Sequence, residues 1–543
     1  LTGRKEGFDD LRKYGGMSGF PKRKESKCDA FDTGHSSTSI SAGLGYVAAR
    51  ELQQEHYNVV SVIGDGSMTG GMAYEALNNA SRLKSNFIIV LNDNTMSISK
   101  NVGGMSNYLN GLRTTQVYSD LKRGVEDTIK RIPGRGERIV HQVKKTKSGI
   151  KQLFVPGMFF EDMGITYLGP VDGHDLKTLT KTLNEAKRVN HAVLVHVVTK
   201  KGKGYLPAET NPSKFHGTGP FDVTTGETIG GSGKDSYTDI FSKVLADIGK
   251  KDKKVVAITA AMADGTGLKR FKNLFPERFF DVGIAEEHAV TFAAGMAKAG
   301  LKPVFAVYSS FLQRAYDQVL HDVCAQNLPV VFAVDRAGLV GKDGATHQGI
   351  FDLSYLSSIP NLTVMAPKNK WELSDMLKFA IAAEEPVAIR YPRGEACDLW
   401  KDQRAPIQKG CAEVLAEGTY AALFAIGSMV ETAWQVRKKL AEKGIPTTVV
   451  NARFAMPLDK NCLRKLAESH PLLVTMEENV ASGGFGEHVA AFLEEEALHT
   501  KVLRIAIPDC FVEHGSVGEL KKALGLDADS VTEKILAELP EEL

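Results

Sequence analysis

The sequence predicts an α/β protein built from three consecutive α/β domains with parallel or mixed sheets. Short runs of β-branched and other apolar residues alternate with helix-like stretches along the chain, the order typical of strand–helix–strand units. The first two strand candidates, residues 59–63 and 87–91, are short, β-branched and uninterrupted, as expected of strands that are buried on both faces. With 543 residues, the chain is long enough for about two to four domains that each have a core.

The first domain is expected over residues 1–232. Apolar runs at 59–63 and 87–91 predict two buried strands, and residues 72–83 between them predict a helix. A strand, helix and parallel strand place both carboxyl ends at one edge of a sheet, where open α/β sheets bind ligands. The Gly-rich residues 226–233 are interpreted as the linker that ends this domain.

Two further α/β domains are expected over residues 236–395 and 410–543. The strand candidates of the second domain are residues 255–259, 303–307, 329–334 and 386–390. Those of the third domain are residues 421–426, 447–450, 472–475 and 502–505. Each set is expected to form a sheet of its own.

One basic segment interrupts this alternation. Residues 122–151 contain ten Lys or Arg against three acidic residues, together with a Pro-Gly pair. We interpret the segment as a solvated helical insertion. A lid over a phosphorylated ligand is the more plausible role, because the aromatic residues that stack nucleic-acid bases are missing.

The overall composition excludes several classes of protein. Hydrophobic residues make up 43% and charged residues 24%, as in ordinary globular proteins, and a net charge of +2 argues against a dedicated nucleic-acid binder. No apolar run approaches the roughly 18 residues that span a bilayer, and no secretory leader is recognisable. The six cysteines form no C-x-x-C pair, which favours reduced thiols and a cytoplasmic location.

Two polar strings follow the first two predicted strands. They are Gly-Asp-Gly at 64–66 and Asn-Asp-Asn at 92–94. If both strand ends share an edge, Asp65 and Asn94 can meet at one cation, and carboxylate and amide oxygens suit magnesium better than zinc. The alternative is that each string is only a turn, since Gly, Asp and Asn are common turn residues.

A cluster of small polar residues precedes the apolar stretch 40–49. Gly34, His35 and Ser36 begin this cluster, which continues with another serine and a threonine. Hydroxyl groups and free backbone N–H groups at a helix N-terminus attract phosphate. The alternative is a plain Ser/Thr N-cap.

A pair of acidic residues opens an Ala-rich helix in the second domain. By itself, Glu286 is explained as a carboxylate favoured by the helix dipole. A carboxyl that is partly buried in an apolar pocket has a raised pKa and can share a proton with a ligand.

Together these strings carry a family resemblance. The Gly-Asp-Gly string and an Asn about one helix later resemble the motif that binds thiamine diphosphate. The chain resembles the 1-deoxy-D-xylulose-5-phosphate synthases, relatives of transketolase, over nearly its whole length. The segments that carry this resemblance are residues 34–42, 170–175, 281–292, 308–322, 335–338, 344–349 and 391–394.

The resemblance implies a transketolase-like fold that binds thiamine diphosphate and Mg²⁺, with the cofactor between the first and second domains. It implies that Asp65, Asn94 and the carbonyl of Met96 bind the metal. The cofactor-binding residues that it implies are Gly34, His35, Ser36, Gly66, Ser67, Asn94, Tyr205, Glu286 and Phe311. Glu286 is expected to activate the pyrimidine ring and Phe311 to stack on it.

The resemblance also assigns the substrate site. The residues implied to bind the substrates are Tyr308, Arg336 and Arg393, which hold a phosphate, together with Arg12 and Asp343. His216 and His347 are expected to be catalytic, since an imidazole that titrates near neutrality can donate or accept a proton. The resemblance assigns no chemistry to residues 200–203.

The activity implied is the decarboxylating condensation of pyruvate with glyceraldehyde 3-phosphate to deoxyxylulose phosphate, in a homodimer without nucleic acid or membrane partners. One alternative is ketol transfer of the transketolase type, which releases no carbon dioxide. Another is a non-catalytic subunit that binds thiamine diphosphate. This second alternative arises because the family carries a further N-terminal stretch with active-site histidines, and the sequence begins beyond it.

Overall fold

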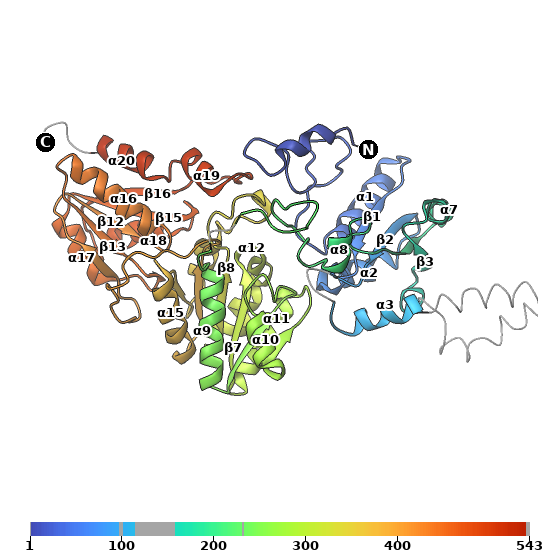
Figure 1. The fold of residues 1–543 in the computed structure, drawn as a ribbon, viewed down its shortest axis with the longest axis horizontal. Coiled ribbons are helices and arrows are strands. Elements are labelled where there is room, and N and C mark those ends of the chain that lie inside the picture. Colours follow the sequence, from blue (N-terminus) through green and yellow to red (C-terminus); the bar gives the residue numbers. More distant parts are fainter. Residues whose placement is uncertain (1, 97–100, 115–157, 231–232, 539–543) are drawn as a thin grey trace, which may run out of the picture. The chain divides into compact units, whose positions relative to one another are not determined.

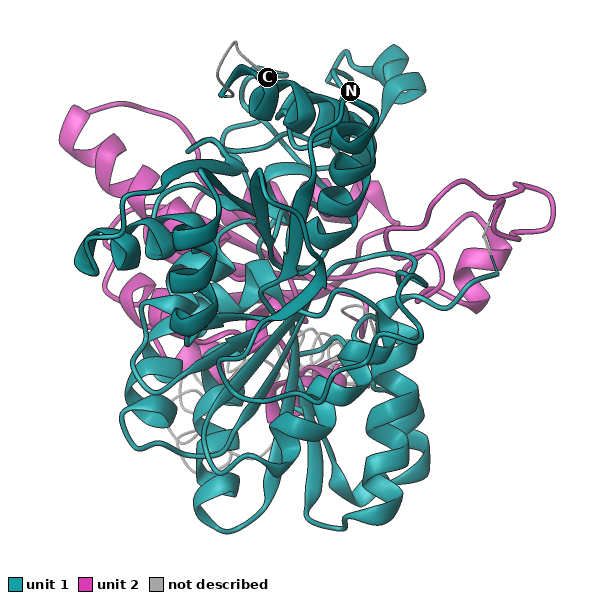
Figure 2. Ribbon diagram, turned by 90° about the vertical axis from the view of Figure 1, so that its left-hand side faces the viewer, with its two compact units in different colours: residues 1–35, 232–281, 286–543 teal, residues 36–231, 282–285 magenta. Residues whose placement is uncertain are grey.

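The computed structural model describes residues 2–96, 101–114, 158–230 and 233–538. By residue contacts the chain forms two compact units, which are coloured separately in Figure 2. Unit 1 comprises residues 1–35, 232–281 and 286–543, and unit 2 comprises residues 36–231 and 282–285. The basic segment 122–151 lies outside the described residues. The expected division into three domains remains a prediction.

Unit 2 contains a parallel sheet of four strands in the order β1-β2-β4-β3 (Figure 1). The strands are β1 (Val60–Gly64), β2 (Phe87–Asp93), β3 (Thr166–Asp172) and β4 (Ala192–Val198). The helices are α1 (Ser39–Gln53), α2 (Gly71–Ala80), α3 (Gly104–Thr114), α6 (Met158–Asp162), α7 (Leu176–Ala186) and α8 (Leu206–Thr210), with the short turn η2 (Ser67–Thr69). Side chains of α1, α2, α3 and α6 form the core on one face, and α7 covers the other.

The first sheet of unit 1 has seven strands in the order β14-β9-β10-β8-β7-β5-β6. They are β5 (Val255–Thr259), β6 (Phe279–Asp281), β7 (Lys302–Tyr308), β8 (Val331–Asp335), β9 (Thr363–Met365), β10 (Val387–Tyr391) and the antiparallel β14 (Phe454–Met456). Its helices include α9 (Tyr237–Lys251), α10 (Lys269–Leu274), α11 (Glu286–Lys298), α12 (Ser309–Leu312), α13 (Tyr316–Gln318), α14 (Asp352–Ser357) and α15 (Lys370–Ala382). Helices α9 and α15 pack together over one face of this sheet.

The second sheet of unit 1 has five strands in the order β11-β13-β12-β15-β16. They are the antiparallel β11 (Glu413–Ala416), β12 (Ala421–Ala425), β13 (Thr447–Asn451), β15 (Leu472–Val480) and β16 (Lys501–Ile507). The helices are α16 (Met429–Glu442), α17 (Lys460–Ser469), α18 (Phe485–Glu495), α19 (Val517–Ala523) and α20 (Ala528–Ala537). The strands β12, β13 and β15 are buried along their whole length, although only β12 is apolar throughout: β13 begins with two threonines and β15 contains two buried glutamates.

The structure confirms the predicted fold class. Each strand predicted from an apolar run is present, with its ends shifted by a few residues. The helix expected over 72–83 ends earlier, at Ala80, where the backbone N–H of Leu83 turns back to the carbonyl of Ala80. The strands β6, β9 and β14 have only three residues each, too few to give a periodic pattern, and were not predicted.

The N-terminal residues up to 35 group with unit 1. Nε2 of His514 donates to the carbonyl of Gly16 at 2.9 Å, and Lys22 forms an ion pair with Glu513. These contacts attach the segment to the loop before α19. Among the described residues, no helix combines the length and apolarity needed to cross a membrane.

Candidate active site

The carboxyl edge of the unit 2 sheet brings the two polar strings together. Gly64 pairs with Asn92 in the register of β1 and β2, and the backbone N–H of Asp65 donates to the carbonyl of Asn92 at 3.2 Å. Asn94 follows one residue after β2. The predicted parallel neighbours therefore place Asp65 and Asn94 at the same edge.

Asp65 is a buried carboxylate with one oxygen left over. Asp65 is 4% exposed, and its Oδ2 accepts a hydrogen bond from Nδ2 of Asn101 at 2.7 Å. Its Oδ1 is buried and has no hydrogen-bond partner among the described residues. Burial, followed by the neighbouring carboxyl of Asp93, raises the pKa of Asp65 to about 7. A cation at Oδ1 would satisfy this oxygen and lower the cost of burying the charge.

The loop after β2 is held by its own side chains. Oδ1 of Asn94 accepts from the backbone N–H of Met96 at 3.1 Å. Asp93 is fully buried and contacts Nε2 of His196 at 2.9 Å. Nδ1 of His196 in turn contacts the hydroxyl of Tyr167 at 2.8 Å. These contacts among Asp93, His196 and Tyr167 could not be predicted from the sequence, because the three residues lie on different strands.

A lysine and a histidine meet beside the same edge. Nζ of Lys201 donates to Nδ1 of His216 at 2.9 Å. Burial lowers the pKa of Lys201, while the charge of Asp65 acts in the opposite direction. Burial and the lysine charge also lower the pKa of His216. Sequence reasoning assigned no chemistry to Lys201, although its position after β4 marks it as a residue of this edge.

Tyr205 lies in an aromatic cluster of unit 2. Its ring packs against Phe215 and Phe221, with centroids 5.5 and 5.9 Å away, and its hydroxyl donates to the carbonyl of Val223 at 2.8 Å. The ring is therefore held in place by neighbours on the loop that follows α8.

The turn before α1 packs on the loop after β1. Oγ of Ser37 donates to the carbonyl of Ser67 at 2.8 Å, and the carbonyl of Gly66 accepts from the hydroxyl of Thr69. The backbone N–H of Ile284 donates to that same hydroxyl at 3.0 Å. The helix expected after residue 39 is present as α1, with Ser36 in the turn that precedes it.

In unit 1, Glu286 is the first residue of α11 and is 3% exposed. Its Oε2 is buried and has no hydrogen-bond partner within the described part of the chain. Nη1 of Arg314 lies 3.9 Å from that oxygen. Burial raises the pKa of Glu286 to about 7, so that the carboxyl holds a proton in a substantial fraction of molecules at neutral pH.

An aromatic cluster surrounds Phe311. Its ring meets those of His35 and His347 edge-on, with centroids 4.9 and 5.4 Å away, and lies at a small angle to that of Tyr308 at 5.5 Å. His35 donates from Nε2 to the carbonyl of Ser310 at 3.1 Å. Residues that the sequence placed in one site are therefore neighbours in unit 1.

Gly34 is required by a close approach. A Cβ at this position would lie 2.5 Å from Cβ of Thr346, so a side chain would collide with the turn that carries His347. Nδ1 of His347 contacts the hydroxyl of Thr346 at 2.8 Å. Any side chain larger than hydrogen would displace this turn.

The pKa of His347 differs from the expected titration near neutrality. Its ring stacks on that of Phe20, with centroids 4.9 Å apart and planes inclined by 19°. Burial lowers the pKa of His347 to about 4, although Asp343 raises it in part. Burial also lowers the pKa of His35. Because desolvation disfavours the imidazolium, His347 is neutral at pH 7 in this structure.

The arginines sit at the carboxyl edge of the seven-stranded sheet. Tyr308 and Tyr391 both pair with Asp335 in register, so β8, which precedes Arg336, lies between β7 and β10, the strand that precedes Arg393. The guanidinium carbon of Arg336 lies 3.8 Å from the ring centroid of Tyr308.

Polar contacts fix Arg336 and the neighbouring arginines. Nη1 of Arg336 donates to the carbonyl of Gly265 at 2.9 Å. Asp343 pairs through one oxygen with Arg12, at 2.6 Å, and through the other with Arg393, at 3.1 Å. One carboxylate therefore bridges two cations that lie far apart in the sequence.

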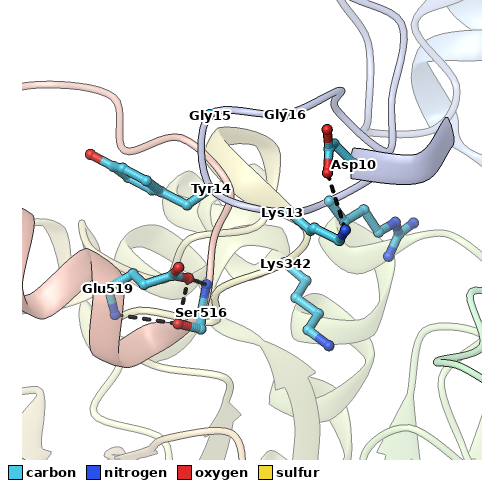
Figure 3. Close-up of a pocket in the computed structure, with 9 residues that line it drawn as sticks. Asp10, Lys13, Tyr14, Gly15, Gly16, Lys342, Ser516 and Glu519 are labelled. Atoms are coloured by element: carbon cyan, nitrogen blue, oxygen red, sulfur yellow. Dashed lines mark hydrogen bonds and ion pairs between the residues drawn. The ribbon is translucent and has the colours of Figure 1, made fainter. Parts of the chain in front are cut away.

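A cavity of about 440 Å³ adjoins this bridge and is lined by Arg12 and Lys342. Figure 3 shows Lys342 on the side of the cavity opposite Gly15 and Gly16. The other residues that line it are Asp10, Lys13, Tyr14, Ser516 and Glu519. Lys13 forms an ion pair with Asp10, and Ser516 and Glu519 form the capping box at the start of α19.

The site residues predicted from the sequence thus fall into two sets. In unit 2 are Ser36, Asp65, Gly66, Ser67, Asn94, Met96, Tyr205 and His216. In unit 1 are Arg12, Gly34, His35, Glu286, Tyr308, Phe311, Arg336, Asp343, His347 and Arg393. Each set contains one buried carboxylate, Asp65 or Glu286, with an oxygen that accepts no hydrogen bond from the described residues.

Comparison with known protein families gives three matches along the chain. Residues 1–199 match the model described as 1-deoxy-D-xylulose-5-phosphate synthase. Residues 234–397 match the pyrimidine binding domain of transketolase, and residues 410–531 match the transketolase C-terminal domain.

Solved structures show a fold of the transketolase type. A structure titled split gene transketolase, inactive beta4 tetramer, is 30% identical with a TM-score of 0.51, and covers 56% of this chain and 98% of that one. A transketolase from Campylobacter jejuni subsp. jejuni is 17% identical with a TM-score of 0.50, and covers 93% of this chain and 82% of that one. The second likeness concerns the fold alone.

Among curated proteins, the 1-deoxy-D-xylulose-5-phosphate synthase of Lachnoclostridium phytofermentans is 60% identical over 536 residues, which are 98% of this chain and 86% of that protein. The fold and the family matches are those of a transketolase-like transferase. The chain belongs to the 1-deoxy-D-xylulose-5-phosphate synthase family.

Proposed function

We propose that this chain condenses pyruvate with D-glyceraldehyde 3-phosphate to give 1-deoxy-D-xylulose 5-phosphate and carbon dioxide, with thiamine diphosphate and Mg²⁺ as cofactors. The observation that carries the proposal is the pair of buried carboxylates, Asp65 and Glu286, each with an oxygen that lacks a partner among the described residues. One suits a cation and the other suits a ring nitrogen. The identity to curated synthases supports the same reaction.

The residues of unit 2 would hold the metal and the diphosphate. Oδ1 of Asp65, which has no hydrogen-bond partner among the described residues, would bind the cation, while Asn101 fixes the other oxygen of that carboxylate. The amide of Asn94 and the carbonyl of Met96 would add two further oxygen ligands of the kind that Mg²⁺ prefers. The turn around Ser36 precedes α1, whose N-terminal end favours an anion.

The residues of unit 1 would hold and protonate the heterocycle. The pKa of about 7 lets Glu286 donate a hydrogen bond from Oε2 when protonated and accept the proton back when ionised. Phe311 would offer its ring face to the pyrimidine. Thiamine diphosphate, when bound, supplies the nucleophilic carbon and the electron sink that the decarboxylation of pyruvate requires.

The substrate phosphate would be held by fixed cations. Arg336 is oriented by the ring of Tyr308 and the carbonyl of Gly265, and its planar guanidinium matches the geometry of a phosphate. Arg393 and Arg12 share Asp343, which restrains both side chains in the absence of substrate. His347, with a pKa of about 4, would act as a neutral hydrogen-bond partner that takes up a proton only transiently.

The deciding experiment incubates the full chain with Mg²⁺, thiamine diphosphate and both substrates and identifies the sugar phosphate formed. We expect deoxyxylulose phosphate and one carbon dioxide per product, with no release when the aldehyde is omitted. Ketol exchange between sugar phosphates without carbon dioxide would instead support a transketolase. Cofactor binding without turnover would support a non-catalytic subunit.

A binding experiment tests the metal site. Asp65→Asn is expected to weaken Mg²⁺-dependent binding of thiamine diphosphate by at least about tenfold, because it removes a charged ligand. Quenching of intrinsic protein fluorescence measures this binding without turnover. Unchanged binding would remove Asp65 from the metal site. We propose in addition that the enzyme is cytoplasmic and forms a homodimer. Analytical ultracentrifugation tests the oligomeric state.

A further inference from the structure

Helix α12 carries Phe311 and directly follows Tyr308, and a buried polar network holds its first residue. Oγ of Ser309 donates to Oδ2 of Asp352 at 3.0 Å. The carbonyl of Ser309 accepts from the hydroxyl of Tyr355 at 3.2 Å. Asp352 and Tyr355 both lie on α14, so a single helix holds α12 at two points.

Arg390 on β10 donates to the carboxylate of Asp352, which lies at the centre of this network. Nε of Arg390 lies 3.0 Å from each carboxylate oxygen of Asp352, and its Nη2 donates to the carbonyl of Glu478 at 3.2 Å. Asp352 is fully buried and Arg390 is nearly so. Because desolvation opposes the burial of an ion pair, the Asp352–Arg390 pair is expected to add little to the free energy of unfolding. Its hydrogen bonds instead hold α14 and β10 in one relative position.

The network ends at the last two residues of β15, Asn479 and Val480, in the five-stranded sheet. Oδ1 of Asn479 accepts from the backbone N–H of Leu353 at 3.1 Å, and its Nδ2 donates to Oγ of Ser354 at 2.8 Å. The backbone N–H of Val480 donates to the carbonyl of Ile350 at 2.9 Å. The end of β15 therefore holds α14 through side-chain and backbone contacts.

We propose that Asp352 is a positioning residue that fixes α12 from the five-stranded sheet, so that Phe311 and Tyr308 keep the orientation that cofactor and substrate require. The C-terminal sheet thereby contributes to the active site without providing a residue that touches the ligands. The inference rests on the proposed function, because it assumes that Phe311 stacks on the cofactor.

The test uses two variants that remove one hydrogen bond each and leave the Asp352–Arg390 pair intact. Ser309→Ala removes the hydroxyl that donates to Asp352, and Tyr355→Phe removes the hydroxyl that donates to the Ser309 carbonyl. Each is expected to raise the dissociation constant of thiamine diphosphate about 3- to 10-fold, the usual effect of one buried hydrogen bond. The measurement is fluorescence quenching with Mg²⁺ and no substrate.

A positioning role also predicts a particular kinetic pattern. KM for thiamine diphosphate should rise more than kcat falls at saturating cofactor, because added cofactor restores the ordered helix. A merely structural role would lower Tm without raising KM for thiamine diphosphate more than it lowers kcat. Ser357→Ala is the matched control: it removes a buried hydroxyl from α14 that has no hydrogen-bond partner in the described part of the chain, and it should leave binding unchanged.

Phe311→Ala separates this inference from the proposed function. If Phe311→Ala leaves cofactor binding unchanged, the stacking role fails and the positioning role fails with it. If Phe311→Ala weakens binding while Ser309→Ala and Tyr355→Phe both stay within twofold of the parent, the positioning role alone is wrong. Should Ser309→Ala fail to fold, Tyr355→Phe decides, since it removes only a hydroxyl from a retained ring.

Discussion

The ring of Phe20 lies flat against the imidazole of His347, with ring centroids 4.9 Å apart. This contact removes water from one face of the histidine and belongs to the burial that lowers its pKa to about 4. Phe20 comes from the N-terminal segment, which is attached to the loop before α19 through a hydrogen bond between His514 and Gly16. The electrostatic state of a predicted catalytic residue thus depends on a segment far away in sequence.

Phe20→Ala is expected to raise the pKa of His347 toward its ordinary value of 6.5, because water regains access to the ring. Titration of the histidine ring resonances by NMR measures this pKa directly. The control is Phe8→Ala, on a ring in the same segment that is 64% exposed. A His347 that still titrates near pH 4 in Phe20→Ala would show that other neighbours dominate.

Glu286→Gln should abolish turnover and also change how stability depends on pH. Burial raises the pKa of Glu286 from 4.5 to about 7 in the folded chain, so between these values the folded chain binds more protons than the unfolded chain. This contribution is present below pH 4.5 and is lost as pH rises through 7. Without cofactor, Glu286→Gln should therefore gain stability over the parent between pH 5 and pH 8, by at most roughly 3 kcal/mol.

Denaturant unfolding of the cofactor-free chain at both pH values checks this expectation. Asp65 and Glu477 also have a pKa of about 7 through burial, but both are present in parent and variant, so the difference isolates residue 286. Glu287→Gln, on the neighbouring residue, is the matched control. A stability difference that does not change with pH would mean that Glu286 is ionised in the folded chain throughout.

Arg336→Lys should raise KM for glyceraldehyde 3-phosphate by about 10- to 100-fold while KM for pyruvate changes little. A lysine cannot reproduce the planar fork that stacks on Tyr308 and donates to Gly265. Steady-state kinetics with each substrate varied in turn provides the measurement. Arg404→Lys, which alters an exposed pair with Asp375, is the control. Equal changes in both KM values would argue against selective phosphate binding by Arg336.

Gly34→Ala should lower both stability and cofactor affinity, because the added Cβ would lie 2.5 Å from Thr346. Gly45→Ala is a sharp control: Gly45 lies within α1 and a Cβ there meets nothing within 4 Å. That control should gain up to about 1 kcal/mol from the higher helix propensity of alanine. Thermal unfolding of both variants distinguishes the two effects. Wild-type stability in Gly34→Ala would show that the turn at Thr346 yields easily.

The sequence predicted the sheets well because central strands such as β2 and β12 are largely buried and carry apolar runs. Strand β4 was overlooked, since His196 interrupts its apolar run, and that histidine is buried against Asp93. The Asp65–Asn94 edge followed from the parallel connection alone. By contrast, the bridge from Arg12 to Asp343 joins residues 331 positions apart, a tertiary contact that no local pattern encodes.

The histidine chemistry shows a second limit of local patterns. A loop histidine was expected to titrate near neutrality, but the packing of Phe20 and the loop residues determines the desolvation of His347. Motif resemblance located Glu286 and Phe311, whereas Asp352 and Arg390, which hold Ser309 beside Phe311, lie outside every segment that carries the resemblance. Their grouping arises from three elements that converge below the strand ends.

Strand β14 lies between two strands of the five-stranded sheet in sequence, yet it pairs with β9 at the border of the seven-stranded sheet. Deletion of residues from 410 onward would therefore remove β14 from β9 and expose unpaired backbone amide and carbonyl groups on β9. Such an open strand edge favours self-association. A shortened chain that ends before this point should aggregate rather than persist as a smaller soluble protein. Fragments for crystallography or engineering would need to retain Phe454–Met456.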